Sequence, residues 1–355
     1  MRAIGALLVV ASHLLIFYVS DVSSIFPWIL SKETLTFSND VTRIEDILLK
    51  IMTETNINFG ALGVSIFFLI SGFCLMITLD RSEKILTKIF LLKKLLRLYP
   101  VYIAGFGIGT VLFLIYTEAA GTEFKYTVLD CFMQITLTGR LFGFASIDGL
   151  VWTLEVQLLF YILAYVLYRF NLLDNPIQIL KVSFCILLLK FIFANTGVYF
   201  FVVLSEMIPS LFIMFIGICC YKCYSEKWSI GETLGLTVLL FFAYSVTQSI
   251  TAVSYFVGLL LFITMMFADK YYQNGKQSKL LGFISQISYS LYASHSLISY
   301  NLLSVFNHWG VYPTAASFIV LSVEFIAAIA LYYLVEKPSA RLMSRILMIG
   351  VKQKK

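Results

Sequence analysis

Ten long apolar runs constrain this chain more than any other feature. Each run has 16 to 22 residues, and a helix of about 20 residues crosses the hydrocarbon core of a bilayer. Lipid offers no hydrogen-bond partner to an exposed backbone, so we expect each run to be a helix. The pattern predicts an all-α integral membrane protein with about ten transmembrane helices. The runs cover residues 3–20, 60–79, 98–117, 150–168, 177–194, 207–222, 230–248, 250–268, 282–303 and 314–335.

Composition excludes a soluble globular protein and a nucleic-acid-binding protein. Hydrophobic residues make up 60% of the chain and charged residues 13%, against about 45–50% and about 25% in soluble domains. A packed core stops growing at roughly 250–300 residues, so this much apolar surface needs the bilayer as its solvent. The net charge is only +6, and the basic residues follow the loops rather than one face. We therefore expect membrane lipids as partners, and no nucleic acid.

The distribution of basic residues predicts the topology. With the N-terminus in the cytoplasm, 20 of the 26 Lys and Arg residues fall in cytoplasmic segments, five fall outside and Lys190 lies within a run. Cytoplasmic loops of membrane proteins carry this excess of Lys and Arg. The asymmetry favours ten spans with both termini in the cytoplasm. We expect one transmembrane domain over residues 1–340 and a basic cytoplasmic tail over 341–355.

Arg2 and His13 are the first polar pair within an apolar run. Eleven residues of helix separate them by roughly 16 Å and return to within about 20° of the same face. The pair would suit a ligand with an anionic head at the surface and a reactive end at mid-membrane, where a neutral imidazole accepts a proton. The alternative is that Arg2 sets the topology and His13 makes a polar packing contact.

Further ionisable groups lie at or within the spans, where charge is costly and therefore a sign of function. Lys93, Lys94 and Arg97 precede Pro100; they could clamp a phosphate or anchor the chain to anionic lipid. Glu155 could orient His13, bind substrate or pair with a cation. Cys219, Cys220 and Cys223 have no fourth ligand nearby in the sequence, so we expect packing rather than a metal site.

Five segments resemble, in order, the membrane-bound acyltransferase 3 family, which includes O-acetyltransferases of cell-surface polysaccharides. They span nearly the whole chain, and the expected ten-span layout with an internal N-terminus is also that of the family. The segments are RAIGALLVVASH (2–13), GVSIFFLISGF (63–73), KKLLRLYP (93–100), LVWTLEVQLLFY (150–161), and ISYSLYASH (287–295) followed by VEKP (335–338).

The resemblance implies a membrane-bound O-acyltransferase of the bacterial cytoplasmic (inner) membrane. Its co-substrate would be cytoplasmic acyl-CoA, usually acetyl-CoA, without a metal. Its acceptor would be a hydroxyl of a cell-surface glycan or of a lipid-linked precursor. His13 would be the general base, with Arg2 and Glu155 as its catalytic partners. The other implied site residues are Lys93, Lys94 and Arg97 for the phosphates of the donor, and Ser71, Gly72, Trp152 and His295 along the substrate path.

The chain departs from the family pattern at several positions. Lys94 stands where the family usually has Arg, which keeps the charge but not the bidentate geometry. Gln157 stands where many members have Glu, and Glu155 lies about 200° away around a helix. Ser65 stands where some members have Asp. Relatives have several residues before the first motif, which favours an earlier natural start than Met1.

Two other function classes remain open at this point. Ten spans, Glu324 at membrane depth and intramembrane cations would suit a transporter or a flippase of lipid-linked sugars, although no inverted repeat is visible. A structural membrane protein that binds partners through its outer loops is the third possibility. The sequence leaves open the acceptor glycan, the acyl length, an acyl-enzyme intermediate and assembly into a homo-oligomer.

Overall fold

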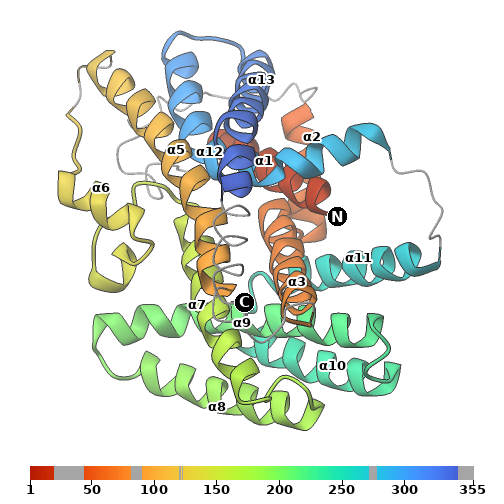
Figure 1. The fold of residues 1–355 in the computed structure, drawn as a ribbon. Coiled ribbons are helices and arrows are strands. Elements are labelled where there is room, and N and C mark those ends of the chain that lie inside the picture. Colours follow the sequence, from red (N-terminus) through yellow and green to blue (C-terminus); the bar gives the residue numbers. More distant parts are fainter. Residues whose placement is uncertain (20–43, 81–89, 120, 122, 272–277, 343–355) are drawn as a thin grey trace.

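The structure is a computed structural model that describes residues 1–19, 44–80, 90–119, 121, 123–271 and 278–342. These residues form helices and connecting turns, with no strand among them (Figure 1). The predicted all-α fold is confirmed. Most of the predicted basic tail, from residue 343 onward, lies outside the described residues.

Ten long helices coincide with the ten predicted runs. They are α1 (Arg2–Val19), α3 (Phe59–Asp80), α5 (Phe90–Ala119), α7 (Val151–Arg169), α8 (Pro176–Ala194), α9 (Tyr199–Tyr224), α10 (Ile230–Thr247), α11 (Ala252–Tyr271), α12 (Lys279–His308) and α13 (Pro313–Leu331). A π-helical turn, η3 (Tyr332–Glu336), follows α13. The long connections carry short helices: α2 (Ile44–Thr55), α6 (Val128–Ile135) and η2 (Gly139–Phe142).

Eight of these ten helices are long and apolar enough, by length and composition alone, to cross a membrane. The other two are α1, whose apolar part covers Arg2–Leu15, and α12. Helix α12 contains seven serines together with His295, Tyr300 and Asn301. Buried polar side chains of this kind lower the hydropathy of a helix that packs inside a bundle. Helix α12, the least apolar of the long helices, is therefore the one that carries His295.

Two helices extend well beyond their apolar runs. Helix α5 begins at Phe90 rather than at 98, and α9 begins at Tyr199 rather than at 207. The added residues of α5 include Lys93, Lys94 and Arg97, and Lys and Arg favour helix. Hydropathy marks only the apolar part of a helix, so the predicted starts of α5 and α9 lie eight residues too late in the sequence.

Helices α1 and α3 form the centre of the packing. Helices α5 and α13 pack on α12, and α8 and α10 pack on α9 (Figure 1). Helix α1 joins the first group through α12, and α3 joins the second through α9, while α1 and α3 pack on each other. This arrangement brings residues of all five motifs to one interior.

Glycines set the close approach of the central helices. A Cβ on Gly63 would lie 2.6 Å from the carbonyl oxygen of Gly5 in α1. A Cβ on Gly72 would lie 1.9 Å from the carbonyl oxygen of Met214 in α9. Small residues let helix backbones approach in this way.

Candidate active site

A first cavity, of about 760 Å³, lies at the end of the molecule that holds the N-terminus of α1. Five cationic side chains and one carboxylate line it: Arg2, Lys94, Arg97, Lys337 and Arg341, with Glu336. They come from the start of α1, the start of α5 and the turns after α13. The surplus of positive charge makes this cavity suited to an anionic ligand.

The helices hold the polar groups of this basic cavity in defined contacts. Arg2 Nη2 lies 3.5 Å from Cys74 Sγ, and Lys94 Nζ lies 5.0 Å from the centre of the Tyr161 ring, within the range of a cation–π contact. Ser290 Oγ donates to Glu336 Oε2 at 2.7 Å. The only carboxylate among the described lining residues is therefore already hydrogen-bonded.

The basic cavity includes some of the predicted site residues and not others. Ser71 lines it and accepts a hydrogen bond from Gln157 Nε2 at 2.5 Å. Lys93 is not among its lining residues. Gly72, which was predicted along the substrate path, is not among the lining residues; it faces α9, where its missing Cβ allows the two backbones to approach closely.

A second cavity, of about 700 Å³, lies nearer the opposite end of α1 and contains His13. Its walls carry the aromatic residues Trp152, Tyr244 and Tyr255, and its charged residues are Arg140 and Glu206. Polar groups of Asn58 and Gln248 also line it. Aromatic walls with a few converging polar groups are typical of a binding site for a small molecule.

His13 lies in a cluster with residues of α12. Its Nδ1 is 2.7 Å from Tyr300 Oη. Its ring meets the ring of His295 edge to face, with centroids 5.0 Å apart and planes at 82°. The side chain is thus fixed by residues that lie almost 300 positions away in the sequence.

His295 is fully buried, and its backbone contacts define its tautomer. Nδ1 lies 3.2 Å from the carbonyl oxygen of Leu291 and 3.0 Å from that of Tyr292. A carbonyl only accepts, so Nδ1 carries the proton and Nε2 does not. Nε2 has no hydrogen-bond partner among the described residues. The ring of His295 contacts that of His13, and His295 lines neither cavity.

Glu155 pairs with a residue from the long outer connection. Its Oε2 lies 3.4 Å from Arg140 Nη1, and Arg140 Nη2 lies 3.4 Å from Glu206 Oε2. Of the roles that the sequence left open for Glu155, the contacts match the pairing with a cation. Arg140 is thereby held at the wall of the second cavity between two carboxylates.

Asp148, in the loop before α7, is almost entirely buried. Burial raises the pKa of its carboxyl to about 6, although the Leu150 amide, which donates to Oδ1 at 3.1 Å, opposes this shift. The folded protein then holds a proton that the unfolded chain has lost, so this residue costs stability as pH rises from about 4 to about 6.

Asp148→Asn is expected to stabilise the protein at neutral pH by up to about 3 kcal/mol, because the amide keeps the acceptor for Leu150 and never ionises. The melting temperature in detergent, measured for both proteins between about pH 4 and pH 7.5, checks this. The difference should be small at the acid end and grow with pH. An equal difference at every pH would contradict the ionisation of Asp148 as its cause.

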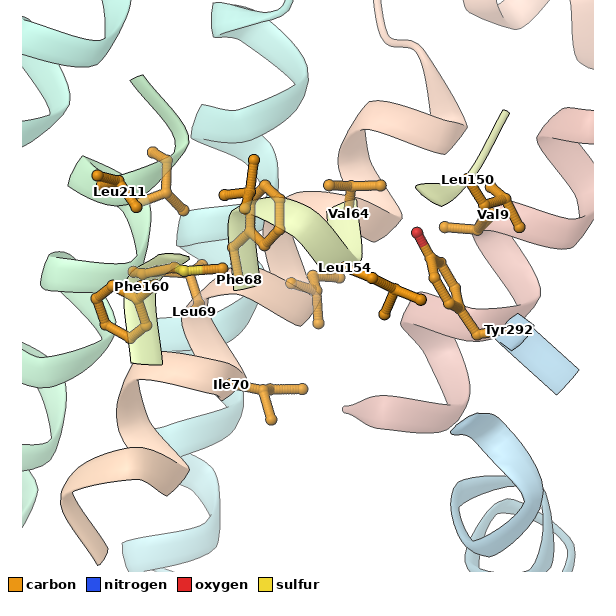
Figure 2. Packing of buried hydrophobic residues seen from close by; sticks show 14 of the residues in the cluster. Val9, Val64, Phe68, Leu69, Ile70, Leu150, Leu154, Phe160, Leu211 and Tyr292 are labelled. Carbon is orange, nitrogen blue, oxygen red and sulfur yellow. The ribbon is translucent and has the colours of Figure 1, made fainter. Parts of the chain in front are cut away.

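The two cavities share part of their walls. Val64 of α3, Thr153 of α7 and Tyr292 of α12 line both. Tyr292 Oη lies 2.5 Å from Thr153 Oγ1. Figure 2 shows the Tyr292 side chain among the labelled residues of the hydrophobic cluster, with its hydroxyl directed away from its own helix. We call these three shared residues the junction.

Sequence reasoning gave no role to several residues that complete the site. Tyr292 lies within the fifth motif and Glu336 within VEKP, so their places in these motifs could have marked them as site residues. Tyr300 and Arg140 carried no signal beyond their polarity. Among the described residues, no group of three or more His, Cys, Asp or Glu side chains is placed to hold a metal ion.

Comparison with known proteins gives one match. A family model, described as an acyltransferase domain, matches residues 1–334 of the 355 residues. No curated protein and no solved structure matches the chain. The matched region contains all ten long helices and every lining residue of the second cavity. Four lining residues of the basic cavity follow it in the chain: Glu336, Lys337, Ala340 and Arg341.

Proposed function

Because the chain belongs to the acyltransferase 3 family, and is thus a multi-pass membrane acyltransferase, we propose that it carries an acyl group from cytoplasmic acyl-CoA to a glycan. The donor is acetyl-CoA in the first instance. The acceptor is a hydroxyl of a cell-surface glycan or of its lipid-linked precursor, at the bacterial cytoplasmic membrane.

One observation carries this proposal: a basic cavity and a His13-containing cavity meet at the junction. A thioester donor with a phosphorylated nucleotide would place its anionic end among the cations of the basic cavity. Its uncharged arm would then reach toward the second cavity. The acceptor hydroxyl would enter from the other end, so the two substrates would meet in the interior.

His13 is proposed as the general base. When Nδ1–H donates to Tyr300 Oη, the other ring nitrogen keeps its lone pair and can accept a proton from the acceptor hydroxyl. The edge contact with His295 limits rotation of the imidazole. A base held in one orientation within hydrogen-bond reach of the attacking hydroxyl is what this reaction requires.

The aromatic walls of the second cavity support a sugar as the acceptor. Trp152, Tyr244 and Tyr255 offer apolar faces with a polar edge, which suits a ring that has C–H faces and peripheral hydroxyls. Arg140 and Glu206 supply a donor and an acceptor beside them. The orientation in the membrane follows the excess of basic residues, which puts the basic cavity on the cytoplasmic side.

The direct test uses the purified protein in nanodiscs with acetyl-CoA. Calorimetry measures binding, and release of free thiol measures cleavage, for the wild type and for the variants His13→Ala and Arg2→Ala. We expect the wild type to bind and cleave, His13→Ala to bind without cleaving, and Arg2→Ala to bind more weakly. A folded wild type that neither binds nor cleaves at millimolar acetyl-CoA would overturn the donor and leave a flippase to be tested.

Arg97→Ala is expected to raise the dissociation constant for acetyl-CoA by about tenfold, because a hydrogen bond to a charged group contributes about 1.5–3 kcal/mol, part of which water replaces. Acetyl-pantetheine lacks the nucleotide phosphates, so its binding should change little. Lys93→Ala is the matched control, since Lys93 lies in the same turn of α5 but outside the cavity wall. Equal losses for both donors would contradict phosphate binding by Arg97.

A further inference from the structure

The proposed reaction can take place only where both substrates reach. The basic cavity and the His13 cavity share Val64, Thr153 and Tyr292 among the described residues. A thioester carbonyl that enters from one side and a hydroxyl that enters from the other would therefore come together at this junction. Val64 has no polar atom on its side chain, so the hydrogen-bonding side chains there are those of Thr153 and Tyr292.

The hydrogen bonds assign the protons of these two hydroxyls. Thr153 Oγ1 donates to the carbonyl oxygen of Leu150 at 2.9 Å, and this uses its only hydrogen. In the 2.5 Å contact between Thr153 Oγ1 and Tyr292 Oη, Tyr292 is then the donor. The junction thus holds one O–H group whose acceptor is another side-chain hydroxyl, which a stronger acceptor can replace.

The ring of Tyr292 is fixed by its neighbours. Phe67 meets it edge to face, with centroids 5.3 Å apart, and the His295 ring lies 5.7 Å away on the next turn of α12. The residue is 7% exposed. A hydrogen-bond donor that is held rigidly stabilises developing charge without having to reorganise.

We propose that Tyr292 is a catalytic residue that donates a hydrogen bond to the thioester carbonyl oxygen as this oxygen becomes negatively charged. Thr153 Oγ1 accepts the same proton in the resting enzyme. The inference rests on the proposed acyl transfer and adds to it the group that stabilises the oxyanion.

The acyl transfer passes through a tetrahedral intermediate. The acceptor oxygen forms a bond to the carbonyl carbon while His13 takes the hydroxyl proton, and the carbonyl π pair moves onto oxygen, where Tyr292 O–H donates to it. Collapse of this intermediate restores the C=O bond and breaks the C–S bond. The thiolate takes the proton from His13, which leaves an ester, free CoA thiol and a neutral imidazole.

Tyr292→Phe tests the proposal, because it removes the hydroxyl and keeps the ring. We expect kcat to fall by roughly 10²–10³-fold, the usual effect of losing one oxyanion donor. The KM and the dissociation constant for acetyl-CoA should stay within about threefold of the wild type. A kcat within threefold of the wild type would overturn the proposal, as would a loss confined to KM.

Thr153→Val separates the Tyr292 hydroxyl from its hydrogen bond to Thr153. It removes the resting acceptor and keeps the Tyr292 hydroxyl, so we expect a smaller loss of kcat than for Tyr292→Phe. If the Tyr292–Thr153 bond were only structural, the two variants would lose turnover and melting temperature equally. That outcome would also overturn the proposal.

A second measurement covers the case in which Tyr292→Phe does not fold. Replacement of Tyr292 by 3,5-difluorotyrosine keeps the shape and makes the hydroxyl a stronger acid. We expect kcat and its pH profile to change while KM does not, and an unchanged kcat would contradict an oxyanion donor. If the wild type transfers the acyl group and His13→Ala does not, a wild-type kcat for Tyr292→Phe would contradict only the role of Tyr292. If the wild type itself shows neither binding nor turnover, the proposed function is contradicted as well.

Discussion

His13→Ala is expected to lower acyl transfer by about 10²–10⁴-fold, the usual contribution of a positioned general base. The variant loses the hydrogen bond to Tyr300 and the contact with His295 but leaves the basic cavity unchanged. Acetyl-CoA affinity should therefore stay near the wild-type value. Turnover with a soluble glycan acceptor, together with donor binding by calorimetry, separates the two effects.

His308→Ala is the matched control for this prediction. His308 lies on α12 like His295, but it is exposed at the C-terminal end of the helix. It should retain full turnover. A His13→Ala protein that folds and still turns over at the wild-type rate would exclude His13 as the base and return attention to transport across the membrane.

Gly72→Ala is expected to prevent α3 and α9 from packing. The added Cβ would lie 1.9 Å from the carbonyl oxygen of Met214 and 3.2 Å from Cα of Gly217. Overpacking of a core costs about 1–3 kcal/mol, and occasionally more, when side chains can shift. Here the obstacle is backbone, so we expect a loss at or above the top of that range.

The measurement is the yield of monodisperse protein and its melting temperature in detergent. Gly107→Ala is the control, because the space around Gly107 in α5 is open and alanine favours helix over glycine by up to about 1 kcal/mol. It should be neutral or slightly stabilising. A Gly72→Ala protein as stable as the wild type would show that α3 and α9 do not approach so closely.

The sequence predicted part of the site because its motifs lie on helices whose ends could be assigned. Arg2, Lys94 and Arg97 were each expected at the cytoplasmic boundary, and the structure brings all three to one cavity. Lys93 and Gly72 were predicted with them because a sequence motif does not show which of its residues face a cavity and which face a neighbouring helix. In the structure Lys93 is not among the residues that line the cavity, and Gly72 lies in the contact with α9.

Helical spacing also predicted that Arg2 and His13 share one stripe of α1. The structure divides that stripe between two cavities, with Arg2 in one and His13 in the other. Tyr292 and Thr153, which belong to other helices, line both of these cavities. The angular spacing along one helix carries no information about which side chains of neighbouring helices pack against it.

The sequence by itself determined the all-helical membrane fold, the positions of the ten long helices and the family, because hydropathy over about 20 residues and ordered motifs are local properties. Only the tertiary structure decided that His13 meets Tyr300 and His295, that Glu155 pairs with Arg140, and that two cavities share Tyr292 in their walls. Each of these contacts depends on how separate helices rotate and cross, and packing of distant side chains, with glycines at the crossing points, sets those angles.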